Sequence, residues 1–198
     1  AGNTPDPVAL NQDALAHRKR DELNEAERLL RRAIEIEDVQ VAADSPKRPH
    51  RRNNLAIVLM RAEKLAAATE LNADAWRLKA GQHDLTSGRV LFVRIALRYL
   101  LGDRDIALYL GQLKTLLRRD GLDCRGDIVP TWDIPDVLTM LRERLEPARA
   151  DLLGRVAAVL NDRARVASLD ACDAWRATTA VPLETPWSDD RVAPIAGG

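Results

Sequence analysis

The amino-acid sequence predicts an all-α fold, a right-handed array of antiparallel helix pairs with a C-terminal helical cap. Apolar residues recur along most of the chain at the three- and four-residue spacing of amphipathic helices, and no segment shows the sustained alternation of a half-buried strand. Aromatic residues make up only 4% of the chain, which suits close-packed helices better than sheets. An apolar helix followed by an Ala-containing helix recurs three times, with second helices at 25–34, 65–75 and around Ala107. Repeated helix pairs of this kind stack into arrays.

The N-terminal part of the chain contains two predicted helices. Residues 1–7 hold two prolines and predict an irregular lead-in, which is followed by a helix over residues 8–20. Asn24 is expected to cap a second helix that ends near residue 38, because Asn side chains accept hydrogen bonds from the free N–H groups of a helix start. The two prolines within residues 39–50 predict a loop.

Glycine residues delimit the next predicted helices. Gly has no Cβ and readily adopts the left-handed conformation that ends many helices. The four helices are expected over residues 50–62, 65–79 (stopped by Gly81), 86–101 (begun by Thr86 or Ser87, stopped by Gly102) and 103–119 (capped by Asp103, closed by Gly121).

The C-terminal part of the chain departs from the pattern of pairs. Residues 120–134 form the longest predicted irregular stretch, and Trp132 within it is expected to pack over the end of the helical stack. Pro135 suits the first position of a helix that ends near Pro147, and two more helices are expected before residue 177. The predicted organisation is helical repeats over 1–120, a helical capping region over 121–178 and an extended or disordered tail over 179–198.

The residues at the predicted helix contacts resemble those of the tetratricopeptide repeat, a helix–turn–helix unit of about 34 residues. The resemblance covers residues 8–120, although the copies are spaced more widely than the repeats of the family and lack its closing proline. An Ala-rich helical hairpin outside the family would show the same pattern. The matching residues are Leu10, Ala14, His17, Ala26, Leu30 and Ala33 in the first copy, Leu55, Ala56, Leu59, Ala68, Asn72 and Ala75 in the second, and Gly102 and Ala107 in the third, where Gly111 replaces the large residue.

The resemblance implies a concave groove, lined by the first helix of each pair, that holds a peptide or a partner helix. Asn side chains suit such a groove because their amides both donate and accept hydrogen bonds with a peptide backbone. The candidate residues for binding a peptide or partner are Asn53, Asn54 and Arg61, together with His17 and Arg94.

A second candidate site, for anions, is the basic cluster of Lys47, Arg48, Arg51 and Arg52. Cations at a helix start meet the positive end of the helix dipole, and this cost favours an anionic partner such as an acidic peptide or a nucleic-acid phosphate. The alternative interpretation is a solvated loop whose charge is offset by the nearby Asp44 and Glu63.

The composition limits the class of function. Thirty basic and thirty acidic residues leave no net charge, which argues against generic nucleic-acid binding. Two cysteines fit a reducing, cytoplasmic compartment, and no apolar run approaches the length that spans a bilayer. The three histidines are far apart in sequence, and no phosphate-binding loop or nucleophile motif occurs. We therefore expect no catalytic residue, no metal site and no cofactor.

The sequence thus predicts a non-enzymatic scaffold or adaptor that binds a protein or peptide in the concave face of a helical array. Two alternatives remain open. One is nucleic-acid or phosphate binding through residues 47–52, and the other is a helical regulatory subunit of a larger enzyme assembly. Whether the chain forms a homo-oligomer also remains open.

Overall fold

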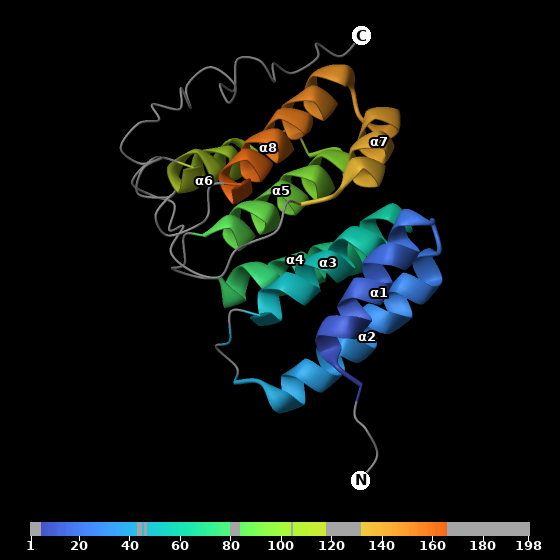
Figure 1. The fold of residues 1–198 in the computed structure, drawn as a ribbon. Helices are drawn as coiled ribbons and strands as arrows, with labels where there is room; N and C mark the ends of the chain where they lie inside the picture. Colours follow the sequence, from blue (N-terminus) through green and yellow to red (C-terminus); the bar gives the residue numbers. More distant parts are fainter. Residues whose placement is uncertain are drawn as a thin grey trace. The chain divides into compact units, whose positions relative to one another are not determined.

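The computed structural model describes residues 5–42, 45, 47–79, 84–103, 105–117 and 132–165. Within these ranges the chain forms eight α-helices and no strand, which confirms the all-α class there (Figure 1). None of these helices is both long enough and apolar enough to cross a membrane. The helices are α1 (Pro7–Lys19), α2 (Leu23–Gln40), α3 (Lys47–Arg61), α4 (Leu65–Leu78), α5 (Leu85–Leu100), α6 (Ala107–Leu117), α7 (Pro135–Arg144) and α8 (Pro147–Arg165).

The chain divides into two compact units, residues 1–80 and 81–198. In the first unit α1 packs on α2, α2 on α3 and α3 on α4, with a smaller contact between α1 and α3. In the second unit α5 packs on both α6 and α8, and α7 packs on α8 (Figure 1). The predicted boundary at residue 120 lies outside the described residues and stays a prediction.

The same kind of turn joins the helices of each of the pairs α1–α2, α3–α4 and α5–α6. One residue in each turn has a left-handed backbone, namely Asp21 (φ 63°), Glu63 (φ 61°) and Gly102 (φ 81°). The N–H of the following residue reaches back to a carbonyl of the preceding helix, at N···O distances of 3.0, 2.9 and 2.9 Å, as in a Schellman motif. The accepting carbonyls belong to His17, Leu59 and Arg98, which recur at the same intervals as the alanines of the sequence pattern. The intervals between the alanines of the sequence pattern are thus also the intervals between successive copies of this turn.

Alanine forms the helix contacts of the first unit. Ala26 and Ala33 on α2, and Ala68 and Ala75 on α4, are all 0% exposed. A methyl side chain lets the backbones of neighbouring helices approach closely, as the sequence predicted.

The third pair departs from this pattern. Ala107 is exposed, so the prediction that it makes a helix contact is wrong. α6 begins only at Ala107, because the carboxylate of Asp103 accepts a hydrogen bond from Asp105 N at 2.9 Å and holds a separate turn before the helix. Ile106 and Leu110 take the buried positions instead, each 2% exposed. For the same reason Asp103 is not the cap of α6.

Three other predicted helix starts are also corrected. α2 begins at Leu23 and contains Asn24, because the left-handed Asp21 has already reversed the chain. α3 begins at Lys47 within the predicted loop, since Pro49 in a first turn needs no N–H donor. α5 begins after Asp84, whose carboxylate accepts from Ser87 N at 2.9 Å.

Gly88 lies at the contact between α5 and α8. A Cβ at this position would be 2.6 Å from Leu160 Cδ2 and 3.4 Å from Leu116 Cδ2. Real Cβ atoms do not approach carbon so closely, and Leu160 is fully buried. The absence of a side chain at residue 88 therefore permits the packing of α5 against α8.

Trp132 precedes α7 and is 7% exposed, which confirms that it packs into the helical body. Its ring meets Phe92 edge to face, with 5.1 Å between centroids and 80° between planes. The Arg89 guanidinium lies 5.6 Å from the Trp132 ring centroid, and burial lowers the pKa of Arg89 to about 10. Asn161 on α8 accepts from Trp132 N at 2.6 Å and donates to Trp132 O at 3.0 Å.

The C-terminal expectations are met only in part. Pro135 begins α7 as predicted, and the helix ends at Arg144, before Pro147. The last predicted helix, the tail over 179–198 and residues 118–131 lie outside the described residues.

The alanine contacts generate a test of packing. We expect Ala26→Leu and Ala68→Leu each to lower the free energy of unfolding by about 1–3 kcal/mol, because the added carbons must displace close-packed neighbours. Ala107→Leu is the control, since Ala107 is exposed and should tolerate the larger side chain. Denaturant titration of the three variants measures the effect. Equal stability of the parent and both buried-site variants would contradict the assigned contacts.

Candidate functional site

The basic cluster predicted as an anion site is engaged by the end of α2. Arg48 Nη2 lies 2.9 Å from Asp38 Oδ1, and Arg52 Nη2 contacts both Asp38 oxygens at 2.8 and 2.7 Å. Arg48 also donates to the Asp38 carbonyl at 3.1 Å. The side chain of Lys47 lies outside the described part of the structure. Asp38 at the end of α2 therefore offsets charge in this cluster, whereas Asp44, which sequence reasoning suggested, lies outside the described residues.

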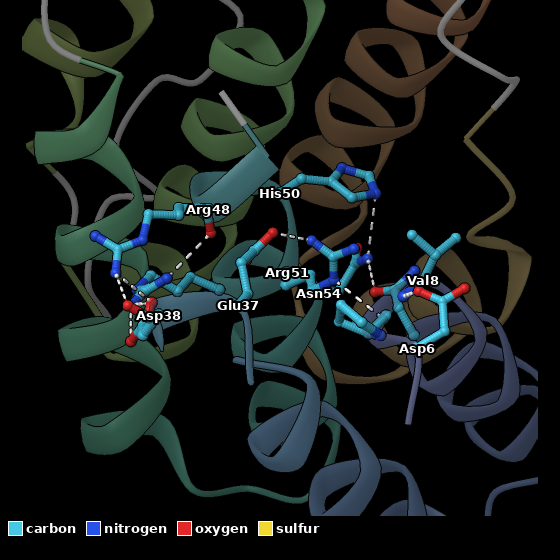
Figure 2. Close-up of polar contacts among 11 residues, drawn as sticks. Asp6, Val8, Glu37, Asp38, Arg48, His50, Arg51 and Asn54 are labelled. Carbon is cyan, nitrogen blue, oxygen red and sulfur yellow. Dashed lines mark hydrogen bonds and ion pairs between the residues drawn. The ribbon is translucent and has the colours of Figure 1, made fainter. Parts of the chain in front are cut away.

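Arg51 lies deeper in the same contact between α2 and α3. It forms an ion pair with Glu37, and the two residues are 5% and 1% exposed. Its Nε also donates to the Pro7 carbonyl at 3.2 Å, so it links α3 to the start of α1 (Figure 2). Burial raises the pKa of Glu37, and the positive charge of Arg51 opposes that rise. Arg51 is thus an internal counterion in this structure.

The two Asn residues predicted to line a groove are both 3% exposed. Asn54 Nδ2 donates to Asn11 Oδ1 on α1 at 2.9 Å, and lies 3.5 Å from His50 Nε2 (Figure 2). Asn53 Oδ1 is buried and has no hydrogen-bond donor among the described residues. Neither amide faces solvent, so both residues would have to become exposed before they could bind a peptide backbone. Their role in binding stays a prediction.

The side chains of Arg61, at the end of α3, and of His17, on α1, both contact the α1–α2 turn. Arg61 donates to the Arg18 carbonyl at 2.7 Å and to Asp21 Oδ1 at 2.8 Å, which ties α3 to this turn. The side chain of His17 is 27% exposed, and its Nδ1 contacts the Glu22 carboxylate. Both side chains therefore stabilise the turn, and their binding role also stays a prediction.

Arg94 on α5 has a different environment. Its guanidinium lies over the ring of Tyr109 on α6, 5.4 Å from the centroid, and Arg98 lies 5.6 Å from the same centroid. These distances are those of cation–π contacts. Arg98 Nε has a carboxylate at 3.2 Å, from Asp103, whereas no described carboxylate is within ion-pair distance of Arg94. Burial lowers the pKa of Arg94, and Arg98 adds to this effect against the influence of Tyr109.

Two leucines close in sequence to this cation–π group are exposed. Leu101 follows α5 and is 50% exposed, and Leu108 precedes Tyr109 on α6 and is 68% exposed. Residues 94, 98 and 101 are four and three positions apart and so share one side of α5. The name α5–α6 surface is used below for Arg94, Arg98, Leu101, Leu108 and Tyr109.

A separate hollow of about 430 Å³ lies between α7 and α8. Its lining includes Leu138, Arg142, Gly154 and Arg155, and the Arg155 charge is paired with Asp151 at 3.0 Å. The described residues contain no group of three or more His, Cys, Asp or Glu side chains that could hold a metal ion.

Sequence reasoning identified Arg94 but missed the residues around it. Tyr109 carries no motif, and its contacts with the two guanidinium groups depend on the contact of α5 with α6. The signal that the sequence did contain is the spacing of Arg94, Arg98 and Leu101 on a helix that is otherwise strongly apolar.

Comparison of the chain with protein-family models finds no match, and neither the search of curated proteins nor the search of solved structures finds one.

The buried ion pair generates a second test. We expect Arg51→Met to lower the free energy of unfolding by about 3–5 kcal/mol, because it leaves the Glu37 carboxylate buried without its counterion. Replacement of both partners, as Glu37→Leu with Arg51→Met, should recover most of that loss. Arg28→Met is the control, since Arg28 pairs with Glu25 on the exposed surface. This substitution should change the free energy of unfolding by no more than the experimental error.

The same variant predicts a pH dependence with a defined sign. Without Arg51 the raised pKa of Glu37 should rise further, so folding takes up a proton at pH values above the ordinary value of 4.5. The stability deficit of Arg51→Met relative to the parent should be smallest near pH 4.5 and should grow as the pH rises. Denaturant titrations between pH 4.5 and 7.5 measure it. A deficit that is independent of pH would show that Glu37 does not carry the effect.

Proposed function

We propose that this chain is a non-enzymatic helical scaffold that binds a protein or peptide partner. The observation that carries the proposal is the α5–α6 surface, where Leu101 and Leu108 are 50% and 68% exposed beside a tyrosine and two arginines. Large exposed apolar side chains on the helix pair that also carries a partly exposed tyrosine and arginines support a binding role. Tyr and Arg are also the residues enriched at protein interfaces.

The recurring turns support a repeat architecture for this scaffold. Each of these turns has one residue with a left-handed backbone, and the N–H of the next residue donates to a carbonyl of the preceding helix. The turns recur at the intervals that separate Ala26, Ala68 and Ala107 in the sequence. This recurrence fits a right-handed array of antiparallel, tetratricopeptide-like helix pairs, in which α1, α3 and α5 are the first helices and α7 and α8 form the cap. Two cysteines in 198 residues also favour a cytoplasmic compartment.

Within this array the binding surface is assigned to the third pair. The candidates on α1 and α3 already have partners inside the first unit, as the contacts of Asn54 and Arg61 show. Arg94 on α5 remains accessible and lies next to exposed apolar side chains. The partner contact is therefore expected on α5 and α6. An enzyme that carries this chain as a regulatory subunit would use the same surface.

Nucleic-acid binding through residues 47–52 is less well supported. Arg48, Arg51 and Arg52 each have a carboxylate from α2, so a phosphate would have to displace Glu37 or Asp38. The absence of net charge also removes the long-range attraction that such binding needs.

Capture of partners on the immobilised chain tests the proposal. The parent should retain at least one protein from extracts of its source cells, and Leu101→Ser with Leu108→Ser should lose that protein. The control is Val8→Ser with Val39→Ser, which removes two exposed valines from the first unit and should retain it. Equal retention by both double variants would contradict the assigned surface.

A titration separates this proposal from its rival. We expect duplex DNA and single-stranded RNA to bind the parent only weakly at near-physiological salt, because the basic cluster is internally paired. Nanomolar affinity for either, lost in Arg48→Ala with Arg52→Ala, would establish the nucleic-acid function instead.

A further inference from the structure

The hollow between α7 and α8 has the size of a small-ligand site. Its volume of about 430 Å³ falls in the range of pockets that hold small molecules in proteins. On α7 it is lined by Leu138 and Arg142, which are four residues apart and so share one side of the helix. Its lining on α8 consists of Pro147, Ala150, Asp151, Gly154, Arg155 and Ala158.

Small residues of α8 form an apolar strip along this hollow. Ala150, Gly154 and Ala158 follow one another at four-residue intervals, and the distance from the first to the third is about 12 Å in a helix. A Cβ added to Gly154 would have no heavy atom within 4 Å, so space is open above this residue. Leu138 adds a larger apolar side chain from α7. The strip therefore suits the hydrocarbon part of a ligand.

The charged residues of the lining leave one positive charge without a described counterion. Arg155 Nη2 lies 3.0 Å from Asp151 Oδ2, so these two charges offset each other. Arg155 Nε is buried and has no hydrogen-bond acceptor among the described residues. Arg142 is exposed and forms no ion pair or hydrogen bond within the described part of the chain. The positive end of the α8 dipole also lies in this lining, at Pro147.

Two other carboxylates near α7 and α8 do not line the hollow. Glu146 Oε2 lies 3.9 Å from Arg149 Nε. Glu143 follows Arg142 directly, and consecutive residues of a helix point about 100° apart. The lining therefore matches a ligand with a single negative charge. A carboxylate supplies one such charge and can form two parallel hydrogen bonds with a guanidinium group.

We infer that the hollow between α7 and α8 binds a small carboxylate with a short apolar chain. The carboxylate lies against Arg142, and the chain lies along Ala150, Gly154 and Ala158. This site is separate from the α5–α6 surface and goes beyond the proposed scaffold function. A nucleic acid does not fit it, because such binding depends on several phosphate contacts and the lining holds one cation without a described counterion.

Two probes of the same length test this inference. Octanoate carries the carboxylate, and octanamide replaces it with a neutral amide. We expect octanoate to shift the backbone amide resonances of Gly154 and Ala158 in the ¹⁵N-labelled full chain, with saturation at millimolar concentration. Octanamide should bind about tenfold more weakly, because it lacks the charge that Arg142 recognises. Titrations followed by nuclear magnetic resonance at near-physiological salt provide both dissociation constants.

A second pair of variants tests the space above Gly154. Gly154→Leu should fill the hollow and weaken octanoate binding at least about tenfold, as read from the Ala158 amide. Gly111→Leu on α6 is the matched control, because a Cβ at Gly111 also has no heavy atom within 4 Å and the residue lies outside the lining. It should bind octanoate as the parent does. If Gly154→Leu unfolds on circular dichroism, Ala158→Leu takes its place, read from the Gly154 amide.

A charge variant tests the role of Arg142. Arg142→Gln should weaken octanoate binding about tenfold and leave octanamide binding unchanged, so that the two probes bind alike. Arg144→Gln is the control, since Arg144 is an exposed arginine of the same helix that does not line the hollow. It should retain the preference of the parent for octanoate.

Four outcomes would overturn the inference. They are no saturable shift at Gly154 and Ala158, equal affinity of the parent for the two probes, parental affinity in the variant that fills the hollow, or an equal loss of octanoate binding in Arg142→Gln and Arg144→Gln. The proposed scaffold function is judged separately, by the capture experiment with Leu101→Ser and Leu108→Ser.

Discussion

The buried carboxylate of Glu37 is the constraint on which the first unit depends. A carboxylate that is 1% exposed requires a counterion, and Arg51 supplies it from α3 while also donating to the Pro7 carbonyl at the start of α1. Arg48 and Arg52 pair with Asp38 on the same side of this contact. One requirement of α2 therefore determines how α3 is oriented and which arginines remain available to a ligand.

The two units solve the problem of close helix packing in different ways. In the first unit, fully buried alanines on α2 and α4 allow neighbouring helices to approach. In the second unit, α5 approaches α8 closely at Gly88, where a Cβ would meet Leu160. The pair α5–α6 shares its turn with the first two pairs but not their buried alanine, since Ala107 is exposed. The exposed side of α6 carries Leu108. The third pair therefore departs from the repeat pattern at the place of the candidate surface.

Local periodicity and local chemistry made much of the fold predictable. The spacing of apolar residues indicated the helices, Pro135 indicated the start of α7, and Ala26 and Ala68 indicated the helix contacts. Features that depend on residues distant in sequence were not predictable in this way. Glu37 and Arg51 meet across the connection between α2 and α3, and Tyr109 meets Arg94 across a turn. The turns at Asp21 and Glu63 were also missed, because glycine is the strongest sequence signal of a left-handed backbone and neither turn has one. Of the candidate site, the sequence indicated Arg94 but not the apolar and aromatic residues of the same surface.

The exposure of Leu101 and Leu108 has a consequence for the chain in solution. The protein carries no formal net charge at pH 7, and its isoelectric point from sequence is about 7.1. Net electrostatic repulsion between copies is therefore weakest near neutral pH, where it least opposes contact between the exposed leucines of different molecules. A partner that covers these leucines would act as a solubilising subunit. We therefore expect the cell to produce the two in matched amounts, and an excess of this chain alone to self-associate most readily close to neutral pH.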